Sequence, residues 1–306
     1  MKALIVGTGA VGGFYGALLA KAGWEIAVVS RSDHDIVAAS GIHIRSTLGE
    51  WTFHPAAYRD AAEVETPPDY VILCTKVLPT IDRPALIRPT VGPDTAIVLI
   101  QNGVEIEAEV AEAFPDNELI SGLAFVCVSR TAPGQVWHQA YGNLMLGDFP
   151  AGLSPRVEAL CQAFGQTGIR AKATADIVRA RWRKCVWNAP FNPLSVLSGG
   201  LYTSDILGSQ EDFVRTLMAE VCAIAAATGH PLPDDVIDRN IEDTDKMPPY
   251  KTSMLLDFEA GRPMETEAIL GNAVRAARRE GVAVPHLESV YALMRLRELQ
   301  REKYGR

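Results

Sequence analysis

Short apolar runs alternate with helical and turn-rich patterns through the first half of the chain. The apolar runs span Lys2–Val6, Glu25–Val29, Tyr70–Thr75 and Thr95–Ile100. Short, nearly continuous apolar runs between helices are typical of parallel strands that are buried on both faces. The pattern therefore predicts a parallel sheet that is covered by helices on both sides.

Further strand patterns extend this sheet. Ile42–Arg45 and Glu50–Pro55 have the pattern of an inserted hairpin. Three further strand runs predict antiparallel or mixed strands at a sheet edge, with a turn at Pro133-Gly134; they are Ser121–Val128, Gln135–His138 and Asn143–Leu146. A helical pattern and a short strand between 155 and 172 complete this part of the chain.

The strand pattern stops after about Ala173, and apolar residues then recur with helical spacing. The helical segments are Ile177–Asn188, Glu211–Thr228, Ser253–Glu259, Thr266–Glu280 and Pro285–Glu302. A chain of 306 residues is long enough for two domains. We predict an N-terminal doubly wound domain over 1–173 and an all-helical domain over 174–306, with the ligand in a cleft between them.

A glycine-rich turn follows the first strand directly. Gly7-Thr8-Gly9-Ala10-Val11-Gly12 has the spacing G-x-G-x-x-G and opens a helical segment that starts near Phe14. In this context the first glycine permits the tight turn, the second lets the backbone approach a pyrophosphate, and the third lets helix pack on strand. The helix N-terminus offers free N–H groups to the phosphates. The sequence therefore predicts a Rossmann-type dinucleotide site, the alternative being an ordinary glycine-rich turn.

The residues after the second strand indicate which dinucleotide binds. NAD and FAD sites usually have an acidic residue here for the ribose hydroxyls, whereas this chain has Ser30-Arg31-Ser32. A guanidinium can pair bidentately with a ribose 2′-phosphate, which a carboxylate would repel. We therefore predict NADP(H) as the cofactor, with Arg31 as the phosphate ligand. Asp33 lies close enough to leave NAD(H) open, and Arg31 on its own would also be consistent with a solvated surface residue.

Charge and composition exclude several classes of partner. Hydrophobic residues make up 48% of the chain, and its net charge is −8, from 29 basic and 37 acidic residues. We therefore expect neither nucleic acid nor an anionic membrane as a partner, and no apolar run has the length of a membrane span. Most members of the basic groups are expected on solvated helix faces; these are Arg179, Arg181 and Arg183, and Arg275, Arg278 and Arg279.

The cysteines and histidines do not form a recognisable site. Five cysteines are scattered with no C-x-x-C pair, and six histidines never occur at the spacing of metal ligands. The sequence predicts reduced thiols, a cytoplasmic protein and no bound metal.

Two polar residues follow strands of the predicted sheet. Lys76 comes after the strand that begins at Tyr70, and Asn102 comes after the strand that ends at Ile100. Residues at these strand ends face the nucleotide crevice in a doubly wound sheet. We expect the lysine to contact phosphate or a substrate carboxylate and the amide to contact ribose or nicotinamide, although each would also be normal in an exposed loop.

A second group of polar residues lies in the helical half. Lys184 and Asn188 are four residues apart, hence on one helix face. Pro190 is expected to bend or end the helix and to turn Asn192 toward the same side. A lysine and two amides can hold a small anion that also carries a carbonyl. Ser253 and Glu265 are further candidates, although an acid near a helix N-terminus is favoured there by the helix dipole alone.

Taken together, these motifs resemble the ketopantoate reductases, the NADPH-dependent 2-dehydropantoate 2-reductases, over nearly the whole chain. The matching segments are Gly7–Gly12, Arg31, Cys74–Lys76, Gln101–Gly103, Pro133–His138, Lys184–Ser195, Thr252–Leu255 and Glu265–Gly271. The resemblance implies reduction of 2-dehydropantoate to pantoate in pantothenate biosynthesis.

The resemblance also implies roles for single residues. Lys184 matches the proton donor, and Glu265 matches its acidic partner. Asn188 and Asn192 match residues that line the substrate site, and Ser253 matches a serine that binds the substrate carboxylate.

One position departs from the family pattern. Some members have an asparagine three residues before the serine, where this chain has Tyr250. A reductase of another 2-keto acid or carbonyl compound is therefore the first alternative, and a non-catalytic NADP(H)-binding redox sensor is the second. The last helical segment could supply a homodimer face or a monomer core through the same residues, which are Leu287, Val290, Leu293, Met294 and Leu296.

Overall fold

The computed structural model describes residues 1–305, which form two compact units. The sheet unit contains 1–76, 80–101 and 107–177, and the helical unit contains 77–79, 102–106 and the chain from Val178 onward. Two short segments, 77–79 and 102–106, thus follow strands of the sheet unit but belong to the helical unit. This interleaving matters for the site, because Asn102 is one of the residues concerned.

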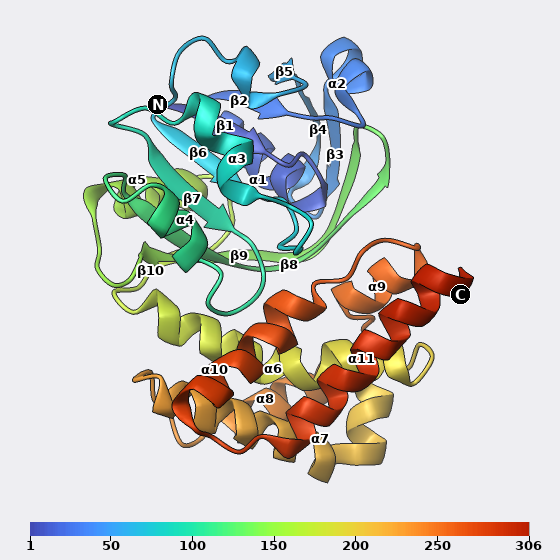
Figure 1. Ribbon diagram of the computed structural model, residues 1–306. Coiled ribbons are helices and arrows are strands. Elements are labelled where there is room, and N and C mark those ends of the chain that lie inside the picture. The colour runs from blue at the N-terminus through green and yellow to red at the C-terminus, as the bar shows by residue number, and fades with distance from the viewer. Residues whose placement is uncertain (306) are drawn as a thin grey trace. The chain divides into compact units, whose positions relative to one another are not determined.

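One sheet runs through the sheet unit (Figure 1). Within residues 1–305 its strands are β1 (Lys2–Val6), β2 (Glu25–Val29), β3 (Ile42–Ser46), β4 (Gly49–Phe53), β5 (Ala56–Tyr58), β6 (Tyr70–Leu73), β7 (Ala96–Ile100), β8 (Leu119–Ala132), β9 (Gln135–Asp148) and β10 (Ala171–Ala173). Their order is β4-β3-β9-β8-β7-β6-β1-β2-β5, and β10 pairs with β9.

The central strands are parallel, as predicted. β1 pairs in parallel with β2 on one side and with β6 on the other, so the order of strands reverses at β1. Ligands bind at such a reversal, beyond the carboxyl ends of the strands. The sequence predicted all four central strands to within two residues at each end.

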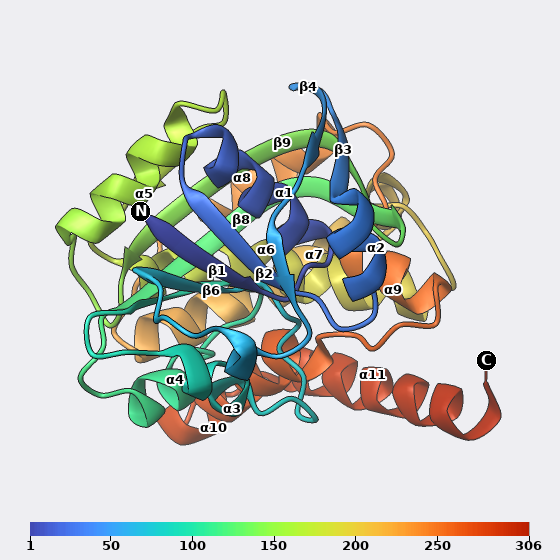
Figure 2. The same cartoon turned by 90° about the horizontal axis from the view of Figure 1, so that it is seen from above.

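Helices cover the sheet unit on both faces (Figure 2). They are α1 (Ala10–Lys21), α2 (His34–Ser40), α3 (Arg83–Ile87), α4 (Ala108–Ala113) and α5 (Pro155–Gly165), with 3₁₀ turns at Ala61–Glu63 and Arg88–Thr90. Successive residues of β1 point to opposite faces. Ala3 and Ile5 therefore join a core with α1 and α5, whereas Leu4 and Val6 join a second core on the other face.

The edge strands differ in detail from the prediction. β8 and β9 form one continuous antiparallel hairpin of 14 residues each, where the sequence indicated three shorter runs. Register shifts occur between Phe125 and Val126 and again near Arg130, and such bulges interrupt the regular alternation from which strands are predicted. β5 was not predicted, because it is three residues long and has no buried residue.

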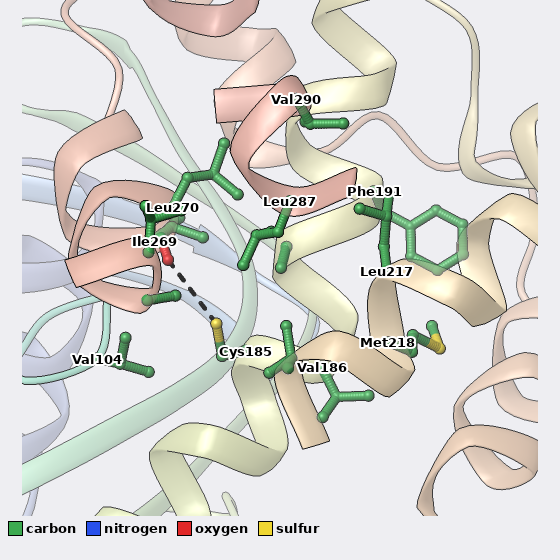
Figure 3. Packing of buried hydrophobic residues seen from close by; sticks show 14 of the residues in the cluster. Val104, Cys185, Val186, Phe191, Leu217, Met218, Ile269, Leu270, Leu287 and Val290 are labelled. Atoms are coloured by element: carbon green, nitrogen blue, oxygen red, sulfur yellow. Dashed lines mark hydrogen bonds between the residues drawn. The ribbon is translucent and has the colours of Figure 1, made fainter. Parts of the chain in front are cut away.

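The helical unit contains seven helical segments within the described part of the chain. They are α6 (Ile177–Leu197), α7 (Thr203–Ala227), α8 (Val236–Asp245), α9 (Ser253–Glu259), a π-helical turn (Glu267–Gly271), α10 (Asn272–Glu280) and α11 (Pro285–Tyr304). Figure 3 shows the core of this unit, where Cys185 and Val186 of α6 pack among Leu217, Ile269 and Leu287. The fold class predicted from the sequence, a doubly wound sheet with an all-α domain, is confirmed.

Pro190 does not end α6. The helix continues through Pro190 and Pro193 to Leu197, although each proline removes one backbone donor. Ala189 and Phe191 on either side of Pro190 are fully buried. Packing of these residues in the core therefore outweighs the local preference of proline to break the helix. The consequence is that Lys184, Asn188 and Asn192 follow one another at intervals of four on a single continuous helix.

The apolar residues of helix α11, which the sequence analysis assigned to a monomer core or to a homodimer face, fall into a buried and an exposed group. Leu287, Val290 and Met294 are buried in the core of the helical unit, whereas Leu293 and Leu296 are 51% and 61% exposed. Only the latter two remain available for a dimer face, which stays a prediction. None of the helices described for residues 1–305 combines the length and the apolar character that a bilayer crossing requires.

Candidate active site

The three glycines of the turn after β1 meet three different surroundings. Gly7 has φ +99°, and a Cβ there would lie 2.7 Å from the backbone nitrogen of Thr75. A Cβ on Gly12 would lie 2.2 Å from the Gly7 carbonyl oxygen, so α1 packs directly on the turn. Nothing lies within 4 Å of a Cβ on Gly9. The turn thus has open space at its second glycine, where a pyrophosphate would approach the backbone.

The start of α1 leaves its backbone donors available. Gly9 is the N-cap residue, no side chain caps this helix, and its first turn contains no acidic residue. Two groups of the motif contact the second strand: the Gly7 N–H and the Thr8 hydroxyl donate to the Val29 carbonyl at 3.4 and 3.3 Å. An anion at this N-terminus would meet free N–H groups and the positive end of the helix dipole.

Arg31 is one of the residues that line a pocket in the sheet unit. The pocket has a volume of about 460 Å³ and is lined by Arg31, Asp60, Thr80, Ile81, Asp82, Ala85 and Leu86. Arg31 itself is exposed. The two acids of the pocket each accept a backbone hydrogen bond at the start of a short helix, Asp60 from Ala62 and Asp82 from Ala85. A pocket of this size with an exposed guanidinium in its lining fits the phosphorylated ribose of a nucleotide.

Asp33 is not available to a ribose in this arrangement. Its carboxylate accepts hydrogen bonds from Arg130 at 2.5 and 2.6 Å, from the Ser32 hydroxyl at 2.7 Å and from the Gly134 N–H at 3.3 Å. Asp33 is the N-cap residue of α2 but does not cap it through its side chain. The carboxylate of Asp33, which left NAD(H) open as the cofactor, therefore already accepts hydrogen bonds from donors of the protein.

A buried arginine connects the turns after β6 and β7. Arg83 is 2% exposed and donates to the side-chain oxygen of Gln101 at 3.1 Å. The amide nitrogen of Gln101 donates in turn to the Thr75 carbonyl at 2.6 Å. Lys76 follows Thr75 and is half-buried in the sheet unit. Sequence reasoning did not single out Arg83, because nothing in the local pattern distinguishes a buried arginine from a solvated one.

In the helical unit, three of the predicted site residues form a chain of hydrogen bonds. Lys184 Nζ donates to Asn102 Oδ1 at 2.7 Å, and Asn102 Nδ2 donates to Glu265 Oε2 at 3.1 Å. The other carboxylate oxygen of Glu265 accepts from the Val77 N–H at 3.0 Å. The amide of Asn102 therefore links the only cation and the only acid that the sequence proposed for catalysis.

The environment of Lys184 favours loss of its proton. Burial and, to a smaller extent, the nearby Arg181 cation lower the pKa of the ammonium from 10.5 to about 8, although the Glu265 carboxylate acts in the opposite direction. Arg181 is 2% exposed and donates to the Gly103 carbonyl at 3.1 Å. The expectation of a solvated helix face was thus wrong for Arg181, because it lies one turn from Lys184 on the buried side of α6.

The segment that carries Asn102 is attached to the helical unit at several points. The Val104 N–H donates to the Ala268 carbonyl at 3.0 Å, and Asn272 donates to the Val104 carbonyl at 2.7 Å. Gly103 has φ +110°, and a Cβ there would lie 2.6 Å from the Ala268 carbonyl oxygen. The close approach to the π-helical turn therefore requires glycine at position 103. These contacts place Asn102 next to both of its partners.

The predicted substrate residues lie on two helices of the same unit. Asn188 and Asn192 of α6 are 8% and 2% exposed, and no hydrogen bond from either side chain occurs among residues 1–305. Asn188 lines a small cavity of about 10 Å³, room for one water at most, together with Lys184. Ser253 is exposed at the first turn of α9, where the Thr252 hydroxyl accepts the capping hydrogen bond from Leu255 instead.

Comparison with known proteins identifies the family. The family model described as ketopantoate reductase PanE/ApbA matches residues 3–151, and the model of its C-terminal part matches residues 176–298. The chain belongs to the ketopantoate reductase family. The resemblance inferred from the sequence motifs is thereby confirmed.

Individual members of this family align with almost the entire chain. A solved structure of 2-dehydropantoate 2-reductase from Methylococcus capsulatus is 64% identical, with a TM-score of 0.95 and coverage of 98% of this chain and 97% of that one. The enzyme of the same name from Geobacter metallireducens is 36% identical, with a TM-score of 0.91 and coverage of 97% and 99%. A curated 2-dehydropantoate 2-reductase from Nostoc sp. is 35% identical over 298 residues, which are 95% of this chain and 93% of the relative. The predicted enzyme class, an oxidoreductase acting on a CH–OH group, is confirmed, and the family depends on a pyridine nucleotide.

Proposed function

We propose that this ketopantoate reductase homologue reduces a 2-keto acid to the 2-hydroxy acid with NADPH, and that 2-dehydropantoate is the substrate. The observation that carries the proposal is the chain Lys184–Asn102–Glu265, in which a lysine with a pKa of about 8 is held by a neutral amide and an acid. A donor whose pKa lies near neutral pH is suited to give up a proton in the transition state.

The sheet unit supplies the cofactor site in this proposal. The open space at Gly9 and the uncapped start of α1 fit a pyrophosphate, and the exposed guanidinium of Arg31 fits a 2′-phosphate. Lys76 would add a positive charge beyond the end of β6. When bound, NADPH supplies the hydride that reduces the carbonyl carbon.

Lys184 acts as the general acid in this proposal. Negative charge develops on the carbonyl oxygen during reduction, and an ammonium stabilises that charge and then transfers its proton to the oxygen. Asn102 can only accept from Lys184 through its carbonyl oxygen, because its amide nitrogen is bonded to Glu265. Glu265 thus orients the amide, and its negative charge favours the protonated form of the lysine. Asn102, which the sequence suggested as a cofactor ligand, orients the general acid Lys184 in this proposal.

Asn188, Asn192 and Ser253 bind the substrate. The two amides are buried side chains without internal partners among the described residues, so a ligand carbonyl or hydroxyl would satisfy them. The exposed hydroxyl of Ser253 can donate a hydrogen bond to a carboxylate.

A reductase of a different 2-keto acid is the second candidate, and Tyr250 is the observation that favours it. Its ring lies 6.3 Å from that of Trp187, one residue before Asn188 on α6. The aromatic side chain thus takes the place of the family's asparagine near the predicted substrate residues and would favour a more apolar substrate side chain.

Oxidation of NADPH by the purified protein in the presence of a 2-keto acid tests both candidates. 2-Dehydropantoate should be compared with pyruvate, 2-ketoisovalerate and larger branched or aromatic 2-keto acids. We expect the highest kcat/KM with 2-dehydropantoate. A higher value with another keto acid would select the second candidate, and tight NADPH binding without turnover of any keto acid would favour a non-catalytic sensor.

A further inference from the structure

The environment of Asp33 bears on the choice between NADPH and NADH. This acid is two residues from Arg31, and its side chain is only 5% exposed. Its partner Arg130 comes from β8, 97 residues later in the chain, and contacts both carboxylate oxygens. The cation that pairs with Asp33 therefore lies on β8, outside the segment from Gly7 to Arg31 that carries the dinucleotide-binding motif.

A free carboxylate at this place would change the site chemically. An acid after the second strand of such a fold accepts hydrogen bonds from the ribose hydroxyls and repels a 2′-phosphate. Burial tends to raise the pKa of Asp33, but hydrogen bonds from Arg130 and Ser32 and the charge of Arg130 hold it below its ordinary value. Asp33 is therefore ionised at neutral pH, and its charge is balanced by the arginine and not by a proton.

Building on the proposed function, we propose that Arg130 is a specificity-determining residue for NADPH that acts through Asp33. By pairing with this carboxylate, Arg130 prevents it from binding a ribose diol and from repelling the phosphate that Arg31 binds. The selectivity of the site for NADPH thus depends on two arginines. Arg31 contacts the 2′-phosphate, and Arg130 balances the charge of Asp33.

The remaining contacts of Asp33 make the effect of Arg130 separable from a loss of structure. Without Arg130, the Ser32 hydroxyl and the Gly134 N–H would still hold the carboxylate at the start of α2. The side chain of Arg130 is 40% exposed, so its replacement by glutamine leaves no large cavity. An Arg130→Gln variant should therefore fold and carry an unbalanced negative charge close to Arg31.

The test compares the cofactor affinities of the wild type and of variants at positions 33 and 130, measured by isothermal titration calorimetry without substrate. Kd is determined for NADPH and NADH, and for 2′,5′-ADP and 5′-AMP as probes of the adenosine end alone. Arg130→Gln should raise the Kd of NADPH and 2′,5′-ADP about tenfold, because one unbalanced charge near the phosphate acts at short range. The Kd of NADH and 5′-AMP should stay the same or fall.

The double variant Asp33→Asn/Arg130→Gln distinguishes charge from structure. It lacks both charges, so NADPH affinity should return to within about threefold of the wild type. Equal weakening of NADPH and NADH by Arg130→Gln, or no recovery in the double variant, would overturn the inference. Arg215→Gln is the matched control, since it removes a paired arginine in the helical unit and changes the net charge equally.

The proposed function can fail separately from this inference. If the wild-type protein binds NADH as tightly as NADPH, or if Arg31→Ala leaves the Kd of NADPH unchanged, the assignment of NADPH is wrong. If Arg31→Ala weakens NADPH selectively and Arg130→Gln does not, only the role of Arg130 is wrong.

Discussion

Lys184 donates a hydrogen bond to the side-chain oxygen of Asn102 at 2.7 Å, and this bond fixes which way the amide faces. The opposite end of the amide donates to Glu265, so a rotation by 180° would lose both bonds. Glu265 therefore orients the amide of Asn102, and the neutral amide in turn orients the ammonium of Lys184. A carboxylate at position 102 would pair with the lysine directly and would make it a weaker acid.

Replacement of Asn102 by alanine separates its two possible roles. Because the lysine would lose its oriented partner, we expect kcat to fall about tenfold or more, while the Kd of NADPH in the absence of substrate stays within about twofold. Steady-state kinetics and calorimetry provide the two numbers. A raised Kd with an unchanged kcat would instead support the role of cofactor ligand that the sequence suggested.

The reaction should depend on pH in opposite senses in its two directions. The pKa of Lys184 is lowered to about 8, so the residue is protonated below this pH and neutral above it. Reduction of the keto acid needs the protonated form, and its kcat should fall as the pH rises through about 8. Oxidation of the hydroxy acid needs the neutral form, and its kcat should rise over the same range. In Glu265→Gln both inflections should move to lower pH, because the carboxylate that raises the pKa is gone; an unmoved inflection would mean that another group titrates.

Replacement of Lys184 by methionine should affect catalysis and stability differently. Loss of a general acid typically lowers kcat by about 10²- to 10⁴-fold. The pKa of Lys184 is lower in the folded protein than in the unfolded chain, so the charged form costs stability at pH 7, and this cost disappears as the pH rises from about 8 toward 10.5. The variant keeps the apolar stem, and its Tm at pH 7 should equal or exceed that of the wild type. A Tm lower by several degrees would show that the ammonium stabilises the fold.

The ion pair of Glu105 and Arg279 should stabilise the segment that carries Asn102. Glu105 has φ +51°, a conformation that is unfavourable for glutamate, and Arg279 donates to its two oxygens at 3.1 and 2.6 Å. Arg279→Ala leaves the unfavourable backbone without its partner and should lower the free energy of unfolding by about 1 kcal/mol. Glu105→Asn also loses the pair but tolerates this φ, so it should cost less. Urea denaturation of both variants checks this order, and equal losses would mean that the ion pair alone matters and the backbone conformation does not.

Two glycines of the turn after β1 should respond differently to alanine. A Cβ at position 9 meets nothing within 4 Å, so Gly9→Ala should leave Tm unchanged but raise the Kd of NADPH about tenfold or more by filling the space of the pyrophosphate. A Cβ at position 12 would lie 2.2 Å from the Gly7 carbonyl, so Gly12→Ala should lower Tm as well. Thermal unfolding without cofactor is the deciding measurement, and equal Tm losses would contradict the distinct surroundings of the two residues.

The sequence predicted the features that depend on local periodicity. The central strands of the sheet are buried on both faces, so their apolar runs were visible without any knowledge of their neighbours. The spacing of Lys184 and Asn188 likewise placed both on one helix face. Helix α8 was missed because only Val236, Ile241 and Thr244 are buried in it, too few to give a clear apolar stripe.

Features that depend on distant partners were not predictable. Asn102 and Glu265 are 163 residues apart, and nothing near either position indicates the other. Asp33 appeared to be a free acid because Arg130 is remote in sequence, and Arg181 appeared solvated because it stands in a basic run. The continuation of α6 through Pro190 depends on core packing of its neighbours, which outweighs the intrinsic preference of proline. The site therefore combines residue types that the sequence reveals with pairings that only the folded chain defines.

The membership of 77–79 and 102–106 in the helical unit means that the proposed catalytic centre does not lie within one continuous stretch of the chain. A fragment that begins at Val178 contains Lys184 and Glu265 but lacks the amide of Asn102 and the Val77 N–H that hold them. Separate expression of the helices, or their transfer onto another nucleotide-binding domain, would therefore yield a lysine and an acid without the groups that orient them. An exchange of the helical unit of this chain therefore has to include the segments 77–79 and 102–106, which follow β6 and β7.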